Sequence, residues 1–290
     1  MNGCDICPRG CGVDRTKKVG FCGVGADFIV ARASLHPWEE PPIAGKNGSG
    51  TVFFGGCNLR CVYCQNREIS RGGVGKPMTA DELAAVCLDL QEQGAENLNF
   101  VTPTHYAAAL GKVLQKIRPL LKIPVVYNCG GYEKIGTLRG LDGLVDVYLP
   151  DCKYYDGELS GRLSGAPDYF EVFIGALGEM LRQVGKPPYG ADGKMTRGVI
   201  VRHLVLPGYR HDSIRILDEL AERFGTGAFL LSLMRQYTPT FAADADDENL
   251  HRKVTTFEYE SVLDEARKHG FSGFCQTADA ATAAYTPTFS

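Results

Sequence analysis

The chain lacks any long apolar run, and its 290 residues carry a net charge of only -3. No segment approaches the roughly 18 consecutive apolar residues of a membrane-spanning helix, so we expect no membrane partner. General nucleic-acid binding usually requires a basic face, so the slight acidic excess predicts no nucleic-acid partner either. The first residues are polar and include cysteine, where a secretion signal would be charged and then apolar. These absences together predict a cytoplasmic protein.

Cysteine is too scarce for a disulfide scaffold: the chain has 11, and most of them lie in two short stretches. Clustering of this kind favours metal sites in a reducing compartment. The length and a hydrophobic content of 44% suit one barrel-sized domain with a small appendage. We therefore predict a cysteine-rich, metal-binding N-terminal module in residues 1–50, followed by a partial barrel with a C-terminal helix and tail in residues 51–290.

The second cysteine stretch contains Cys57, Cys61 and Cys64 in the pattern C-x3-C-x2-C. Three thiolates leave one iron of a four-iron cluster open to a small molecule, whereas structural zinc normally has a fourth protein ligand. Residues 51–54 before them form a short apolar run, and the two glycines that follow allow a sharp turn. We expect the cysteines at the C-terminal end of a strand, where barrels place their active sites. Three buried thiols in an ordinary core are the alternative.

Short apolar runs and amphipathic helical patterns alternate after these cysteines, which is typical of repeated βα units. Thr79 with Glu82, and Thr255 with Glu258, form capping-box sequences that predict helix starts. The apolar runs predict six strands, at residues 51–54, 98–101, 123–127, 145–149, 199–206 and 228–233. Six strands are too few to close an eight-stranded barrel. We therefore predict an α/β fold, a partial (β/α)6 barrel, with its site at the C-terminal ends of the strands.

Polar residues occur where most of the predicted strands end, after the second, third, fourth and sixth strands and within the fifth. They are residues 102–105, 128–132, 151–153, 202–203 and 234–237. Each group alone has an ordinary explanation, because loops are polar and lone histidines are usually hydrogen-bonded. Their joint position at one edge of the sheet favours a binding site.

The run Gly55–Cys64 resembles the signature of radical S-adenosylmethionine (SAM) enzymes. The resemblance implies that the open iron chelates the amino and carboxylate groups of SAM. It implies that an electron from the cluster then cleaves the sulfonium to methionine and a 5'-deoxyadenosyl radical. The partial (β/α)6 barrel of radical SAM type is implied as well.

Two further segments resemble pyruvate formate-lyase activating enzymes. Asp151-Cys152-Lys153 is similar to their Asp-x-Lys, and Val201–Gly208 to their fifth strand with its arginine. The likeness is closest to a group of uncharacterised activase-related proteins, whose typical segments are present here: Cys7-Pro8-Arg9, His36 with Glu39-Glu40-Pro41, Gly48-Ser49-Gly50 and Gln65-Asn66.

The resemblance implies a SAM pocket formed by seven side chains: Tyr63, Thr102, Asn128, Asp151, Lys153, Arg202 and Gln236. Tyr63 is implied to border the adenine, and Asn128, Lys153 and Arg202 to hold the SAM tail and ribose. The chain departs from the activases after the second strand, where residues 102–105 contain neither glycine nor acid, and backbone carbonyls are the expected substitute. It departs again after the sixth strand, where glutamine and tyrosine stand in place of a histidine.

The first cysteine stretch contains Cys4, Cys7, Cys11 and Cys22. Four thiolates complete a coordination shell, either tetrahedral zinc or a closed iron-sulfur cluster, and the spacing does not separate the two. Four unrelated thiols are the alternative. A structural element is expected because residues 1–50 are rich in glycine and proline and bury little core. An auxiliary cluster that passes electrons or binds substrate is the second possibility.

These patterns predict a radical SAM oxidoreductase whose adenosyl radical abstracts hydrogen from a substrate. A glycyl-radical activase that works on a partner protein is the first hypothesis, and modification of a small molecule or peptide is the second. A non-catalytic iron-sulfur or zinc protein on the same barrel is the third. Flavodoxin or ferredoxin is the expected electron donor. We also expect Trp38 to pack against the barrel and Cys275 to lie in the core.

Overall fold

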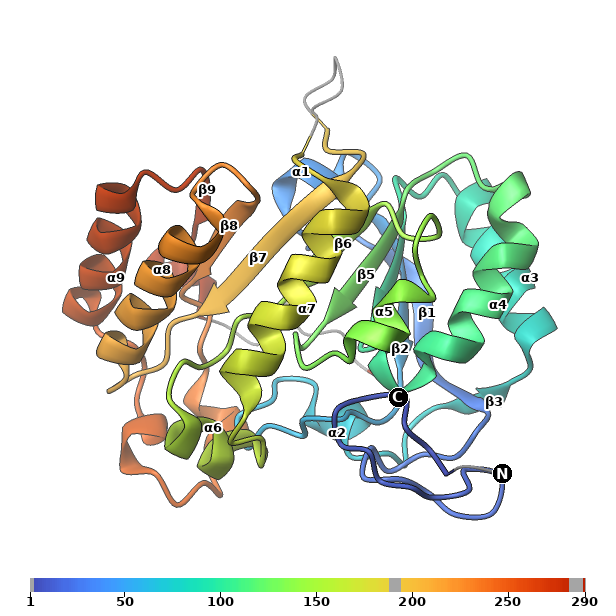
Figure 1. Cartoon of the computed structure of the whole chain (residues 1–290), viewed down its shortest axis with the longest axis horizontal. Helices are drawn as coiled ribbons and strands as arrows, with labels where there is room; N and C mark the ends of the chain where they lie inside the picture. Colours follow the sequence, from blue (N-terminus) through green and yellow to red (C-terminus); the bar gives the residue numbers. More distant parts are fainter. Residues whose placement is uncertain (1–2, 188–193, 282–288, 290) are drawn as a thin grey trace.

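The computed structural model describes residues 3–187, 194–281 and 289 (Figure 1). Within these residues, nine strands form one open sheet in the order β3-β1-β2-β4-β5-β6-β7-β8-β9. Its parallel part comprises β2 (Ser49–Phe54), β4 (Leu98–Val101), β5 (Val125–Cys129), β6 (Val147–Pro150), β7 (Gly198–Leu204), β8 (Leu230–Met234) and β9 (Gly273–Cys275). The six predicted strands are all present, and the partial barrel is confirmed.

Parallel pairing brings the C-terminal ends of these strands to one edge, at the bottom of Figure 1. Val101 of β4 pairs with Asn128 of β5, and Asn128 pairs with Leu149 of β6. One residue further along the chain than β6, Asp151 forms an isolated bridge with Arg202 of β7. This register sets polar side chains from three neighbouring strands at similar heights in the barrel.

Helices surround the outside of the curved sheet (Figure 1): α3 (Ala80–Glu92), α4 (Ala107–Ile117), α7 (Tyr169–Val184), α8 (Arg210–Phe224) and α9 (Thr256–His269). Both predicted capping boxes are confirmed. The side chains of Thr79 and Thr255 each accept a hydrogen bond from the backbone amide of the glutamate three residues later, and that glutamate's side chain accepts one from the threonine's backbone amide. Short helices occur in the connections: α1 (Pro41–Ala44), α2 (Arg67–Ser70), α5 (Ile135–Arg139) and α6 (Gly157–Ser164).

The sheet also contains two antiparallel pairings that the sequence did not predict. Strand β1 (Phe28–His36) runs antiparallel to β2, and β3 (Lys76–Met78) adds to its other side. Val24, Phe28 and Val30 are each only 4% exposed, so the expectation that residues 1–50 bury little core is wrong. The register of β1 shifts between Val30 and Arg32, and this irregularity breaks the alternation by which strands are recognised.

Two burial expectations are also wrong. Cys275 is exposed because it ends the three-residue edge strand β9. Trp38 is 60% exposed, whereas the two glutamates that follow it are less exposed.

Most of the expected C-terminal tail lies outside the described residues. Among the helices described, none is long and apolar enough to cross a membrane.

Candidate functional site

The loop after β2 brings three cysteines to one cavity. Gly56 makes the turn with a φ of 84°, and a Cβ added there would lie 2.7 Å from the carbonyl oxygen of Cys22, so only glycine fits. Cys57, Cys61 and Cys64 then line a cavity at the C-terminal ends of the strands. The sequence therefore placed this loop correctly, at the edge where barrels place their active sites.

The chemistry of this donor set fits a metal cluster. Burial raises the pKa of the Cys57 thiol to about 11 and that of Cys64 to about 12, and mutual repulsion with Cys61 adds to the effect. Such thiols release their protons when a bound metal supplies positive charge, as in metal sites generally. Two donors already point at the sulfurs, since Ser164 Oγ lies 2.9 Å from Cys61 Sγ and the Leu59 amide 3.3 Å from Cys57 Sγ.

Ser164→Ala is expected to shift the reduction potential of a cluster held by these cysteines to a more negative value. The hydroxyl bond to Cys61 Sγ spreads the sulfur's negative charge, and reduction adds a further negative charge to the cluster. A redox titration followed by electron paramagnetic resonance (EPR) measures the potential. Ser160→Ala is the matched control, because Ser160 lies on the same helix and its hydroxyl donates to the Gly157 carbonyl at 3.1 Å instead of to a sulfur. Equal potentials in both variants would contradict the role of Ser164.

A buried ion network also lines this cavity. Asp151 accepts from Lys153 Nζ at 2.7 Å and from Arg202 Nε at 2.7 Å, and Arg202 Nη2 donates to Asn128 Oδ1 at 2.7 Å. Burial alone would raise the pKa of Asp151, but the two cations outweigh it and lower that pKa. The carboxylate therefore stays ionised and holds both cations toward the cavity.

All seven residues predicted to bind SAM line this same cavity: Tyr63, Thr102, Asn128, Asp151, Lys153, Arg202 and Gln236. Their individual roles stay predictions. Thr102 has a φ of 59°, the left-handed conformation that glycine adopts readily and a β-branched residue at a cost of roughly 1–2 kcal/mol. The chain thus keeps a glycine-like turn after β4 without a glycine, and strain of this kind is concentrated at functional sites.

A second cavity adjoins the first and contains two glutamates that the sequence did not place in a site. It is lined by Trp38, Glu39 and Glu40 and shares Asn128 and Arg202 with the first cavity. Glu40 accepts from Ser232 Oγ at 2.9 Å, and Asn128 Nδ2 lies 3.4 Å from Glu39 Oε1. Burial raises the pKa of Glu39 to about 7, against the opposing pull of Arg202. The sequence signal that could have pointed to this cavity is a pair of adjacent glutamates flanked by prolines, within residues 37–42.

Two buried histidines near the site have structural roles. His105 Nε2 bonds to the Gly55 carbonyl at 2.9 Å, and burial lowers the pKa of His105 to about 3. His203 Nδ1 bonds to the Cys152 carbonyl at 2.7 Å, and burial lowers its pKa to about 4. Both rings are neutral at physiological pH, and each positions a loop that carries a site residue.

A third buried acid predicts a pH-dependent stability. Glu133 accepts from Thr104 Oγ1 at 2.5 Å and Tyr127 OH at 3.1 Å, and burial raises its pKa to about 7 from an ordinary 4.5. A raised carboxyl pKa means that the native state binds the proton more tightly than the unfolded state does. The free energy of unfolding therefore falls as pH rises from about 4.5 to 7, by at most about 3 kcal/mol from this group.

Glu133→Gln is expected to flatten this part of the stability profile, because the amide cannot ionise. The measurement compares urea-unfolding midpoints of wild type and variant at pH 5 and pH 8 under anaerobic conditions. Glu171→Gln serves as the control, since the Glu171 side chain is 75% exposed. If the unfolding midpoints of wild type and Glu133→Gln differ by the same amount at both pH values, the pH dependence does not come from Glu133.

The fold and this cavity together define an iron-sulfur enzyme of the kind that leaves one iron open to a small molecule. Residues 51–221, more than half of the chain, match the family model of the radical SAM superfamily. The chain belongs to this superfamily. Membership implies a four-iron, four-sulfur cluster and SAM as cofactors, and Cys57, Cys61 and Cys64 are the residues of this chain that would hold the cluster.

A curated relative and two solved structures are similar to this chain. A Methanocaldococcus jannaschii protein, "Uncharacterized protein MJ0674", is 29% identical over 276 residues, 92% of this chain and 75% of that protein. Streptococcus suis SuiB bound to precursor peptide SuiA matches 76% of this chain with a TM-score of 0.53 and 14% identity. A radical SAM methyltransferase from Sphaerobacter thermophilus matches 80% of this chain and 69% of its own, with a TM-score of 0.51 and 13% identity.

The structural likenesses support the fold alone, because their sequence identities are low. This chain spans about half the length of SuiB, 46% in the peptide complex. SuiB is also solved bound to S-adenosylmethionine, with a TM-score of 0.53 to this chain.

Proposed function

We propose that this chain is a radical SAM oxidoreductase that abstracts hydrogen from a protein substrate, in the manner of a glycyl-radical activase. The observation that carries the proposal is one cavity lined both by three cysteines and by the Asp151–Lys153–Arg202 network. When bound, the cluster and SAM supply a one-electron cleavage that yields methionine and a 5'-deoxyadenosyl radical. Flavodoxin or ferredoxin is the proposed source of that electron.

The side chains of the cavity have complementary tasks in this proposal. Lys153 and Arg202 are the cations available to a carboxylate or ribose hydroxyl of SAM, and Asp151 fixes both of them. Tyr63 is 7% exposed and presents its ring from the cysteine loop. Burial of these groups excludes water from a reactive radical and strengthens each polar contact.

The adjoining cavity is the proposed route for the substrate. It shares Asn66, Asn128 and Arg202 with the first cavity, so a substrate there would lie next to SAM. A substrate C–H bond would break homolytically, its hydrogen atom passing to the 5' carbon to give 5'-deoxyadenosine and a substrate radical. Trp38, which is 60% exposed and lines this cavity, is the proposed contact for a polypeptide segment.

A second candidate substrate is a small molecule or peptide that carries an amine. Glu39 and Glu40 favour it, because their carboxylates line the substrate cavity next to a single guanidinium, that of Arg202, which also pairs with Asp151. A protonated amine would offset the excess of negative charge that burial there makes costly.

A test with fractionated cell extract distinguishes the two candidate substrates, a protein and a small molecule or peptide. Extract from cells that make this protein is divided by ultrafiltration, and each fraction is added anaerobically to reduced protein with SAM. Stimulation of 5'-deoxyadenosine formation by the macromolecular fraction alone supports a protein substrate, and protease treatment should remove that stimulation. Stimulation by the small-molecule fraction alone would reject the activase-like proposal in favour of the second candidate.

A further inference from the structure

Four cysteines of the N-terminal segment gather on two tight loops. Backbone bonds from the Cys4 amide to the Val13 carbonyl at 2.8 Å, and from the Gly12 amide to the Cys4 carbonyl at 3.0 Å, close the first loop. A Cβ added to Gly20 would lie 3.2 Å from Cys11 Sγ and 3.6 Å from Cys22 Sγ, so Gly20 leaves the space between these sulfurs free.

The spacing of these sulfurs does not suit a single zinc ion. Zinc-sulfur bonds of about 2.3 Å in a tetrahedron place the sulfurs only about 3.8 Å apart. No three of the sulfurs of Cys4, Cys7, Cys11 and Cys22 lie within 4.8 Å of one another, and all four residues are described. The same holds for Cys57, Cys61 and Cys64, the ligands of the cluster of the superfamily. A cluster of several irons needs wider spacing, because its cysteines bind different irons.

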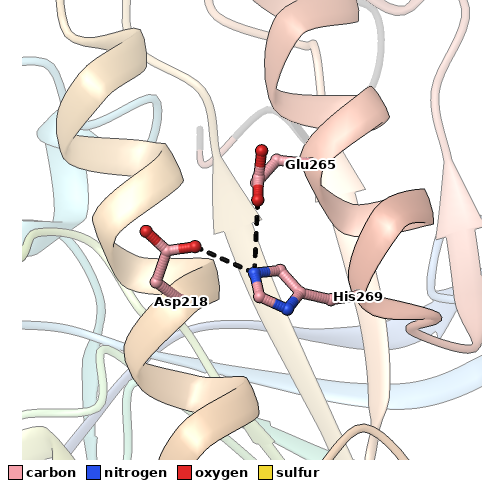
Figure 2. A group of neighbouring side chains, drawn as sticks. All are labelled: Asp218, Glu265 and His269. Carbon is pink, nitrogen blue, oxygen red and sulfur yellow. Dashed lines mark hydrogen bonds and ion pairs between the residues drawn. The ribbon is translucent and has the colours of Figure 1, made fainter.

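Among the described residues, one group is tight enough for a single ion: Asp218, Glu265 and His269. Figure 2 shows the His269 ring between the two carboxylates, with Nε2 at 2.8 Å from Asp218 Oδ1 and 3.3 Å from Glu265 Oε1. The nitrogen that would bind an ion already contacts both carboxylates. This group ties α8 to α9 on the outside of the barrel and has no relation to the cysteines.

The N-terminal loops are fastened directly to the loop that carries Cys57. The Cys57 amide donates to the Cys22 carbonyl at 3.1 Å, so ligands of the two sets are joined by one backbone hydrogen bond. Arg9 Nε donates to the Asn58 carbonyl at 2.7 Å, and its Nη2 donates to the Ser164 carbonyl at 2.7 Å. These bonds tie residues far apart in the chain and place the two cysteine sets side by side.

We infer that Cys4, Cys7, Cys11 and Cys22 hold a second iron-sulfur cluster, of several irons, seated directly against the loop of the SAM cluster. The spacing of the sulfurs argues against zinc, and the four thiolates complete the shell without an open iron. The bond between Cys22 and Cys57 brings the two clusters close enough for their unpaired spins to interact when both are reduced.

The decisive protein is the full chain with Cys57, Cys61 and Cys64 replaced by alanine, which retains only the N-terminal set. It is produced anaerobically in medium that contains both iron and zinc, and iron, acid-labile sulfide and zinc are measured. We expect iron and sulfide to remain with less than one-tenth equivalent of zinc, and a further Cys4→Ser/Cys7→Ser change to remove them. Stoichiometric zinc without iron, or no metal at all, would overturn the inference. This readout does not depend on SAM cleavage, so it is independent of the proposed function.

EPR spectroscopy tests the placement of the second cluster. We expect the dithionite-reduced wild type to show broadening or splitting that is absent from the sum of two single-site spectra. One comes from the alanine variant and the other from Cys4→Ser/Cys7→Ser protein. Cys275→Ser is the matched control, because Cys275 is an exposed cysteine outside both sets, and its spectrum should equal that of wild type. A wild-type spectrum equal to the simple sum would overturn the direct contact between the two sites.

Discussion

Anaerobically reconstituted wild-type protein reduced with dithionite is expected to convert SAM to 5'-deoxyadenosine and methionine, and replacement of Cys57, Cys61 and Cys64 by alanine is expected to abolish this conversion. The three sulfurs line the cavity, and they are the residues placed to hold the cluster that membership of the superfamily implies. Without them no iron remains at which SAM can be reduced. Liquid chromatography of the nucleoside product measures the loss, which should reach the background of a protein-free reaction.

Cys87→Ala is the matched control for this loss. Cys87 is a fully buried cysteine of α3 that packs in the core and does not line the cavity, so its removal should cost stability but leave SAM cleavage intact. Circular dichroism should show that all these variants are folded. Turnover by the triple variant equal to that of wild type would contradict catalysis at these cysteines. Wild-type turnover no higher than the protein-free background would favour a non-catalytic metal-binding protein on the same barrel.

Six of the seven parallel strands were predictable because their signals are local, whereas the three-residue edge strand β9 was not predicted. Each of the six predicted strands, β2, β4, β5, β6, β7 and β8, contains a short apolar run, and the capping boxes at Thr79 and Thr255 mark helix starts within four residues of sequence. Parallel strands connected by helices share one active edge, so residues just past each strand had to converge. Hence residues as far apart as Tyr63 and Gln236 line one cavity, as the sequence predicted.

The features that escaped prediction depend on contacts between distant segments. Strand β1 pairs antiparallel with β2 through an irregular register, and no short-range pattern encodes that partner. Glu39 and Glu40 lie near Asn128 of β5 and Ser232 of β8, which are far from them in the sequence. Arg9 contacts the carbonyls of Asn58, Ser164 and Gly165, and Ser164 is 155 residues away in the sequence. A sequence reading that treats residues 1–50 as a separate appendage misses each of these contacts.

The ion network predicts a large loss of SAM affinity when either cation is removed. Lys153→Ala and Arg202→Ala should each weaken SAM binding by roughly 1–3 kcal/mol, about 5- to 150-fold, because a buried charged hydrogen bond to SAM is lost. Iron content should stay at the wild-type level, since neither residue is a cluster ligand. Anaerobic titration calorimetry measures the affinity, and colorimetric iron analysis checks the cluster.

Arg202→Ala also removes the guanidinium that lies beside Asp151, Glu39 and Glu40. The loss of this buried positive charge can destabilise the fold by several kcal/mol. Arg202→Lys therefore provides a second test: it keeps the charge but loses the planar fork that bonds to both Asp151 and Asn128, so SAM affinity should still fall. Arg118→Ala is the control, because Arg118 makes a two-bond pair with Asp146 at the opposite end of β6. Its loss should lower stability and leave SAM affinity unchanged. If SAM binds Lys153→Ala and both Arg202 variants as tightly as wild type, the SAM pocket is not at this network.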